Sequence, residues 1–176
     1  MGSGWEYALR VCGPGSEEKL ALVGAASFLE AFAGFLDGED ILAHCRKHHS
    51  MAKYAAMMAD PETRVCMAEI NEAPVGYAVV CPPDLPVPTT AGDMELKRIY
   101  LLHRFQGSGM GAALMQWSVD TARSLGKRRL LLGVNDGNDN AVAFYLRHGF
   151  EHAGTRRFQV GNTLCSDFIL AKTLEG

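Results

Sequence analysis

Residues 96–125, LKRIYLLHRFQGSGMGAALMQWSVDTARSL, form the stretch that decides the fold of this chain. The stretch begins with β-forming apolar residues, which predict a strand. A glycine-rich turn follows over 106–111, and residues 112–125 then lack glycine and proline and carry apolar residues at helical spacing. A strand, a glycine-rich turn and a helix N-terminus together predict an anion site, because unpaired N–H groups of the first helical turn can face a phosphate.

Three kinds of phosphate turn can be compared with this stretch. A P-loop requires Gly-Lys-Ser/Thr, but Gly111 is followed by two alanines, so the sequence excludes it. A dinucleotide turn is formally satisfied by Gly107, Gly109 and Ala112, yet the acid expected after the next strand comes too late. If residues 107–112 formed a dinucleotide turn, the protein would be expected to bind NAD(H). The third pattern, Gln/Arg-x-x-Gly-x-Gly/Ala, is satisfied by Gln106, Gly109 and Gly111.

A second motif lies one predicted strand further on, in residues 138–150, NDNAVAFYLRHGF. The two motifs, in this order and at this distance, resemble the GNAT superfamily of acyl-CoA-dependent N-acetyltransferases. The resemblance covers most of the chain, and residues 93–173 carry its specific part. The residues that match the family's N-x-x-A-x-x-x-Y…G-F signature are Asn138, Ala141, Tyr145, Gly149 and Phe150.

The resemblance implies an α/β (α+β) fold with a mixed, mostly antiparallel central sheet of about seven strands, flanked by four helices. The expected elements follow the order β-α-α-β-β-β-α-β-α-β-β. We expect strands at 5–11, 63–70, 73–81, 96–101, 129–134, 150–159 and 165–173, and helices from Ser16 to about Phe35, from about residue 40 to Met58, at 112–125 and at 138–148.

The tail of the chain resembles one branch of the superfamily. Residues 154–161 and 166–170 are similar to the end of the bacterial spermidine/spermine N-acetyltransferase-like branch, as are residues 95–100. The chain departs from that branch at Gly133–Asp136, where the branch commonly has a tryptophan.

Composition favours an ordinary globular protein of 176 residues. We expect one domain over residues 5–176, preceded by a tag remnant at 1–4. The formal net charge of −3 does not favour a nucleic-acid or membrane surface, and no apolar run approaches a spanning helix. The five cysteines are scattered without a C-x-x-C pair, which fits reduced thiols and a cytoplasmic location.

The resemblance implies a site for acetyl-CoA. Backbone N–H groups of the glycine-rich turn would hold the pyrophosphate, and the edge of the strand before it would pair with the pantetheine arm. A backbone N–H near Tyr100 or Leu101 would polarise the thioester carbonyl. The implied cofactor-binding residues are Ile99, Tyr100, Leu101, Gln106, Gly107, Ser108, Gly109, Met110, Gly111, Asn138, Ala141 and Tyr145.

Two residues are candidates for catalysis. The pKa of a lysine-like amine lies about 3.4 units above pH 7, so forming the neutral, nucleophilic amine costs roughly 4.6 kcal/mol. A base or a water relay is therefore needed to remove the proton. Glu95 is the candidate base, acting directly or through water; the alternative is a solvated strand-end carboxylate. Tyr145 occupies the position where the family places a hydroxyl against the thioester sulfur, and it would act by hydrogen bonding. Asn138 would fix the cofactor arm, cap a helix, or both.

Other polar clusters have simpler explanations. His44 and His48 lie one helical turn apart, but no third ligand completes a metal site, so we expect no metal and a solvated helix face. Asp93, or the acids Asp37, Glu39 and Asp40, could attract a cationic acceptor, although for the latter three capping of the second helix is the preferred explanation.

The resulting hypothesis is an N-acetyltransferase that moves acetyl from acetyl-CoA to a primary amine, small-molecule or polyamine-like, by direct attack in a ternary complex. Two alternatives remain: an acceptor that is a protein or peptide, and a non-catalytic acyl-CoA-binding regulatory module. Members of the family are often dimers, so a homodimer is also expected, with no sequence feature that fixes its interface. No nucleic acid or membrane partner is expected. The loops that would shape the acceptor pocket carry no motif.

Overall fold

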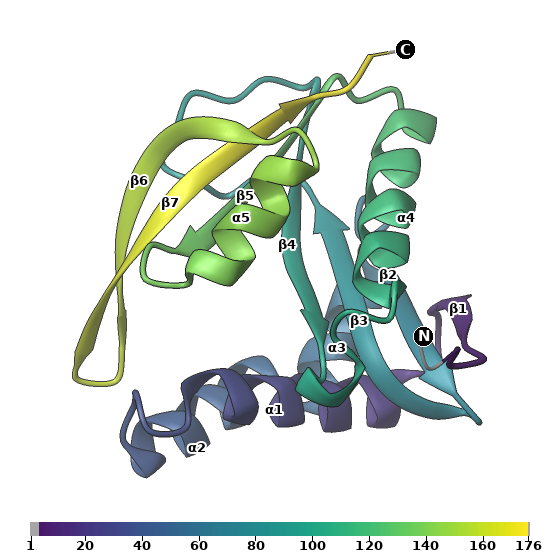
Figure 1. The fold of residues 1–176 in the computed structure, drawn as a ribbon, viewed down its shortest axis with the longest axis vertical. Helices are drawn as coiled ribbons and strands as arrows, with labels where there is room; N and C mark the ends of the chain where they lie inside the picture. The colour runs from purple at the N-terminus through teal and green to yellow at the C-terminus, as the bar shows by residue number, and fades with distance from the viewer. Residues whose placement is uncertain (1–3, 176) are drawn as a thin grey trace.

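A computed structural model describes residues 4–175 of the chain, so residues 1–3 of the expected tag remnant lie outside the described part. Its centre is a seven-stranded sheet in the order β1-β2-β3-β4-β5-β7-β6 (Figure 1). Adjacent strands are antiparallel except β4 and β5, which confirms the expected mixed, mostly antiparallel sheet. The strands are β1 (Ala8–Val11), β2 (Arg64–Ile70), β3 (Ala73–Cys81), β4 (Asp93–Leu101), β5 (Arg129–Asn135), β6 (Glu151–Val160) and β7 (Thr163–Thr173).

The four expected helical segments are present, but the second is interrupted. At the interruption, the Ser50 side chain accepts a hydrogen bond from the Lys53 N–H, which starts a new helix and overrides the expected continuity. The first helix also ends earlier than expected, at Phe32, because Gly34 adopts φ 84°. The helices are α1 (Glu17–Phe32), α2 (Gly38–His48), α3 (Met51–Ala59), α4 (Met110–Ser124) and α5 (Asp139–Arg147), with a short 3-10 turn at His103–Phe105.

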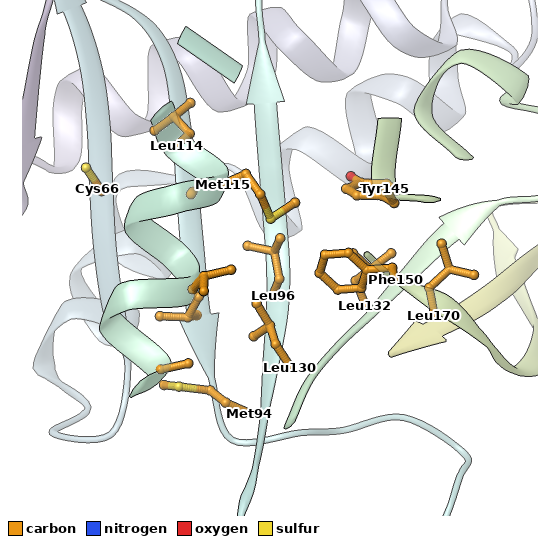
Figure 2. Close-up of a cluster of buried hydrophobic side chains, with 14 of the residues drawn as sticks. Cys66, Met94, Leu96, Leu114, Met115, Leu130, Leu132, Tyr145, Phe150 and Leu170 are labelled. Carbon is orange, nitrogen blue, oxygen red and sulfur yellow. The ribbon is translucent and has the colours of Figure 1, made fainter. Parts of the chain in front are cut away.

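Two hydrophobic layers hold the helices on opposite faces of the sheet. Alternate side chains of β3 point to opposite faces, so that Val80 packs toward α4 and Val79 toward α1 and α3. The layer under α4 and α5 includes Leu114 and Tyr145 from the helices together with side chains of β4, β5 and β7 (Figure 2). The layer under α1 and α3 includes Leu20 and Tyr54, both fully buried.

The sheet splits between β4 and β5. The two strands pair only at Asp93–Glu95 with Arg129–Leu131, although β4 continues to Leu101 and β5 to Asn135. The register between β3 and β4 also shifts at Lys97, where a β-bulge bends β4. Beyond Glu95 the two strands therefore diverge, as Figure 1 shows, and the β5-facing edge of β4 has no strand partner.

The wide end of this split is covered by α1 and α2. The β6–β7 hairpin reaches toward α2 (Figure 1), and Phe28, Leu36 and Ile41 pack there against Val160 and Cys165. The two halves of the splayed sheet are thus bridged at the open end, and a partly open space remains between them.

Within residues 4–175, the model contains no helix that combines the length and the apolar character needed to cross a membrane.

Candidate active site

Two cavities meet in the split between β4 and β5. The acceptor cavity, as we name it, has a volume of about 510 Å³ and lies among β4, β5, α1, α2 and the β6–β7 hairpin. The loop cavity, about 670 Å³, lies among β4, the glycine-rich loop 106–111 and α5. The residues that line both are Ile99, Tyr100, Leu101, His103, Gln106, Asn138, Ala141 and Tyr145.

The glycine-rich loop presents unpaired N–H groups to the loop cavity. Gly107 and Gly109 adopt φ 78° and 92°, which glycine tolerates, and Gly109 is the N-cap of the 15-residue helix α4. Among hydrogen bonds within residues 4–175, none uses the N–H groups of Gly107, Gly109, Gly111 or Ala112. These donors and the positive end of the helix dipole fit a pyrophosphate. The Met110 side chain is instead fully buried in the core, and the Ser108 hydroxyl accepts from the Met110 N–H.

The open edge of β4 offers backbone groups to the same space. The Leu102 N–H donates to the Val75 carbonyl at 2.9 Å, and hydrogen-bonded residues alternate along an antiparallel ladder. Tyr100 therefore directs its backbone groups toward β3, whereas Ile99 and Leu101 direct theirs toward the split. Of the two residues expected to polarise a carbonyl, the register favours Leu101 over Tyr100. The Leu101 carbonyl also accepts from the Gln106 side chain at 3.4 Å.

Tyr145 lies where the two cavities join. It projects from α5, and Figure 2 shows its ring above Phe150 and Leu132. The side chain is 8% exposed, and its hydroxyl makes no hydrogen bond within residues 4–175. Burial, followed by the neighbouring Tyr100, raises the pKa of Tyr145, so this phenol is a hydrogen-bond donor rather than a proton source.

Asn138 caps α5 and lines both cavities. Its side-chain oxygen accepts from the Ala141 N–H at 3.1 Å, which confirms the capping expected from the sequence. The cap holds the first turn of α5, with Ala141, against the junction of the cavities.

Glu95, like Ser108 and Met110 of the loop, is a predicted site residue that lines neither cavity. It lies in the short paired segment of β4, is 3% exposed, and accepts a hydrogen bond from the Asp84 N–H at 2.8 Å. The loop that contains Asp84 therefore satisfies this carboxylate, and neither cavity is lined by Glu95. The geometry does not favour Glu95 as a direct base.

Two histidines expected on a solvated helix face, His44 and His48, line the acceptor cavity instead, together with His49. His44 stacks on Phe28 with ring centroids 4.0 Å apart, and His49 is buried with its Nδ1 2.9 Å from the Tyr54 hydroxyl. Burial and then His48 lower the pKa of His44 to about 4, and burial and then Arg98 lower the pKa of His49 to about 3. These two imidazoles are neutral at pH 7. The contacts with Phe28 and Tyr54, which helical periodicity does not reveal, hold the two rings toward the interior.

Three charged side chains of the acceptor cavity, Arg98, Arg156 and Asp167, come from strands, and none of them was a candidate site residue in the sequence analysis. Arg98 projects from β4 toward the α2–α3 junction, and Arg156 of β6 binds Asp167 of β7. Burial raises the pKa of the Asp167 carboxyl despite this pair, and its hydrogen bond uses only one carboxylate oxygen. Hydrogen-bonded pairing of strands that are distant in sequence brings these residues together, and local sequence patterns do not reveal this pairing.

The acids expected to attract a cation are occupied elsewhere. Asp93 accepts two hydrogen bonds from Arg129, each 2.9 Å, and this pair lowers the pKa of its carboxyl. The acidic side chains of Asp37, Glu39 and Asp40 lie at the start of α2, where the helix dipole stabilises their negative charges. None of these four lines either cavity.

No cluster of three or more histidine, cysteine, aspartate or glutamate residues within 4–175 is arranged to hold a metal ion.

The split between β4 and β5, with an anion-binding loop beside it, is the feature of the fold that the comparisons with known proteins address. Residues 27–150 match the acetyltransferase (GNAT) family, and the chain belongs to that family. A similar chain, an uncharacterized N-acetyltransferase of Mycobacterium tuberculosis, is 33% identical over 157 residues, covering 89% of this chain and 97% of the relative. Another, from Lactobacillus delbrueckii subsp. lactis, is 27% identical over 149 residues, covering 84% of this chain and 86% of the relative.

The fold is also that of solved acetyltransferase structures. The PaiA N-acetyltransferase from Thermoplasma acidophilum, solved in complex with coenzyme A, superposes with a TM-score of 0.79 at 21% identity. The match covers 96% of this chain and 99% of that chain. This likeness confirms the expected fold.

Proposed function

We propose that this protein transfers the acetyl group of acetyl-CoA to a primary amine of a small molecule, by direct attack in a ternary complex. The observation that carries the proposal is the junction of two cavities at Tyr145 and the open edge of β4. One cavity is bordered by an anion-binding loop and the other by charged and neutral polar groups. Two substrates could therefore meet at one hydroxyl without a covalent enzyme intermediate.

The loop cavity suits coenzyme A. The free N–H groups of Gly109, Gly111 and Ala112 would bind the pyrophosphate, and the backbone of Ile99 and Leu101 would pair with the pantetheine arm. The cofactor supplies an acetyl thioester. The Leu101 N–H faces the split and would donate to the thioester carbonyl, where negative charge develops.

The amine must lose a proton, and Asp167 is the carboxylate in the acceptor cavity that suits this step. One of its oxygens binds Arg156, and the other makes no hydrogen bond within the described residues. Burial raises the pKa of its carboxyl, which makes the carboxylate a stronger base than an exposed aspartate. Asp167 thus takes the role that sequence reasoning assigned to Glu95.

The leaving thiolate would be stabilised by Tyr145. Even an unperturbed phenol is a weaker acid than a thiol by about 1.5 pKa units, or about 2 kcal/mol. Burial raises the pKa of Tyr145 further, so hydrogen bonding to the sulfur is favoured over early proton transfer.

A small acceptor is favoured over a protein segment because the acceptor cavity is walled at its far end. The hydrophobic contact of α1 and α2 with the β6–β7 hairpin, including Phe28 and Val160, contributes this wall.

The test is release of coenzyme A thiol from acetyl-CoA against a panel of amines, including spermidine, spermine, amino acids, amino sugars and lysine-ended peptides. We expect release with small amines and none with peptides. Tight acetyl-CoA binding without release from any amine would contradict the proposal and favour the alternative of a binding module.

A further inference from the structure

The acceptor cavity contains an arginine whose charge is not neutralised by the protein. The Nη1 atom of Arg98 donates to the His48 carbonyl and to the Tyr54 hydroxyl, each at 2.9 Å. Within residues 4–175, Arg98 forms no salt bridge with a carboxylate, and its hydrogen bonds involve only the Nη1 atom. Its Nε and Nη2 donors therefore remain available.

The other polar groups around Arg98 do not compensate its charge. His49 is neutral, and the nearby Tyr54 is a hydroxyl held in hydrogen bonds to His49 and Tyr77. The two carboxylates that line the cavity are engaged, since Glu30 accepts from the His103 N–H and Asp167 binds Arg156. A largely buried cation without a counter-ion is costly, so a ligand anion at this position would relieve that cost.

We propose that the cavity selects primary amines that also carry a carboxylate, and that Arg98 binds this carboxylate through Nε and Nη2. A guanidinium edge matches the two oxygens of a carboxylate, which gives direction as well as charge. This inference rests on the proposed acetyl transfer, because it names the acceptor class of the same site.

The two ends of such an acceptor have matching groups in one cavity. Arg98 and Asp167 both act on the Tyr100 hydroxyl: burial raises the pKa of Tyr100, the guanidinium lowers it and the carboxylate raises it. Arg98 and Asp167 both line the acceptor cavity, so this one cavity offers a cation for the carboxylate of an acceptor and a carboxylate for its ammonium. A polyamine would leave Arg98 unpaired and add a further cation beside it, so the cavity favours an amino acid over a polyamine.

The experiment compares acids with their decarboxylated amines as acceptors: alanine with ethylamine, γ-aminobutyrate with propylamine, and lysine with cadaverine, together with spermidine. We expect at least one acid to exceed its amine at least tenfold in kcat/KM. An equal or inverse preference in every pair would overturn the proposal.

The matched variants are Arg98→Met and Arg157→Met. Arg157 is exposed on β6 and lines neither cavity, so its variant should keep the preference for the acid. Arg98→Met should lower kcat/KM for the acid at least tenfold more than for the amine, mainly through KM, and Arg98→Lys should restore part of the loss. If Arg98→Met lowers both members equally, Arg98 only ties β4 to α2 and the proposal fails.

Folding and function are separated by two further measurements. Thermal unfolding and acetyl-CoA affinity report whether Arg98→Met folds. If it does not fold, the preference of the unmodified protein for acids over amines decides the question.

If no amine releases coenzyme A, the proposed function fails, and the carboxylate site is judged by calorimetric titration of the CoA-loaded protein with the same pairs. Tighter binding of the acids supports the site, whereas equal or weaker binding overturns it.

Discussion

At the scale of single residues, the account depends first on the Tyr145 hydroxyl. Replacing Tyr145 by Phe removes the hydrogen bond to the departing thiolate and leaves the packed ring in place. We expect kcat to fall tenfold or more, with acetyl-CoA affinity changed less than twofold, measured by thiol release and calorimetry. The control is Tyr7→Phe, at a tyrosine 37% exposed and outside both cavities. Unchanged thiol release in Tyr145→Phe would refute the role.

The choice of base is a second question for single residues. Asp167→Asn should lower kcat/KM at pH 7 at least tenfold, because the amine then loses its proton acceptor. Glu95→Gln should change it less than threefold, because Glu95 is bound to the Asp84 N–H beneath a loop. The measurement is the pH profile of kcat/KM for both variants. A larger loss of kcat/KM in Glu95→Gln than in Asp167→Asn would identify Glu95 as the base.

Where a motif fixes backbone geometry, several residues expected from the sequence line the cavities. Gln106, Gly107, Gly109 and Gly111 of the loop and the cap Asn138 line the cavities, because glycine conformations and capping are local properties. Arg98 and Asp167 were missed because strand pairing and the break at Ser50, both non-local, place them in the cavity. Glu95 lies outside the cavities because the proline-rich loop, distant in sequence, covers it through the Asp84 N–H, and its role as a base stays a prediction.

At the scale of elements, the turn between β4 and α4 carries a prediction. Gly109→Ala places a Cβ on a residue with φ 92°, so we expect a loss of about 1 kcal/mol in stability and roughly tenfold weaker acetyl-CoA binding. Gly38→Ala, at the start of α2 with open space around its Cβ and no positive φ, should do neither. Thermal unfolding and calorimetry measure both effects. Equal effects in the two variants would contradict the role of the turn.

Most element boundaries were predictable from hydrophobic periodicity and turn chemistry. The β2–β3 hairpin, for example, closes through Asn71 and Glu72, both at positive φ, as its two-residue turn demands. The divergence of β4 from β5 was implied only by the family resemblance. The bulge at Lys97 accompanies this divergence, and it shifts the core-facing residues of β4 from Met94 and Leu96 to Ile99 and Leu101, a change in the apolar alternation that the sequence analysis did not use.

At the scale of the whole molecule, the buried imidazoles make stability depend on pH. Burial and then Arg98 lower the pKa of His49 from 6.5 to about 3, so the unfolded chain binds more protons between these values. The contribution of the neutral His49 to the free energy of unfolding is complete above pH 6.5 and is lost as the pH falls toward 3. The urea midpoint should therefore fall from pH 7 to pH 5, and less steeply in His49→Gln. Identical slopes in the two proteins would show that His49 does not cause the effect.

The central claim is that two substrates meet at one junction and exchange an acetyl group directly. Its most direct test is mass spectrometry after mixing the protein with isotopically labelled acetyl-CoA and an acceptor amine. The account predicts that the label moves to the amine nitrogen and that no labelled protein accumulates. A covalently acetylated protein intermediate, or bound acetyl-CoA that no amine consumes, would contradict it.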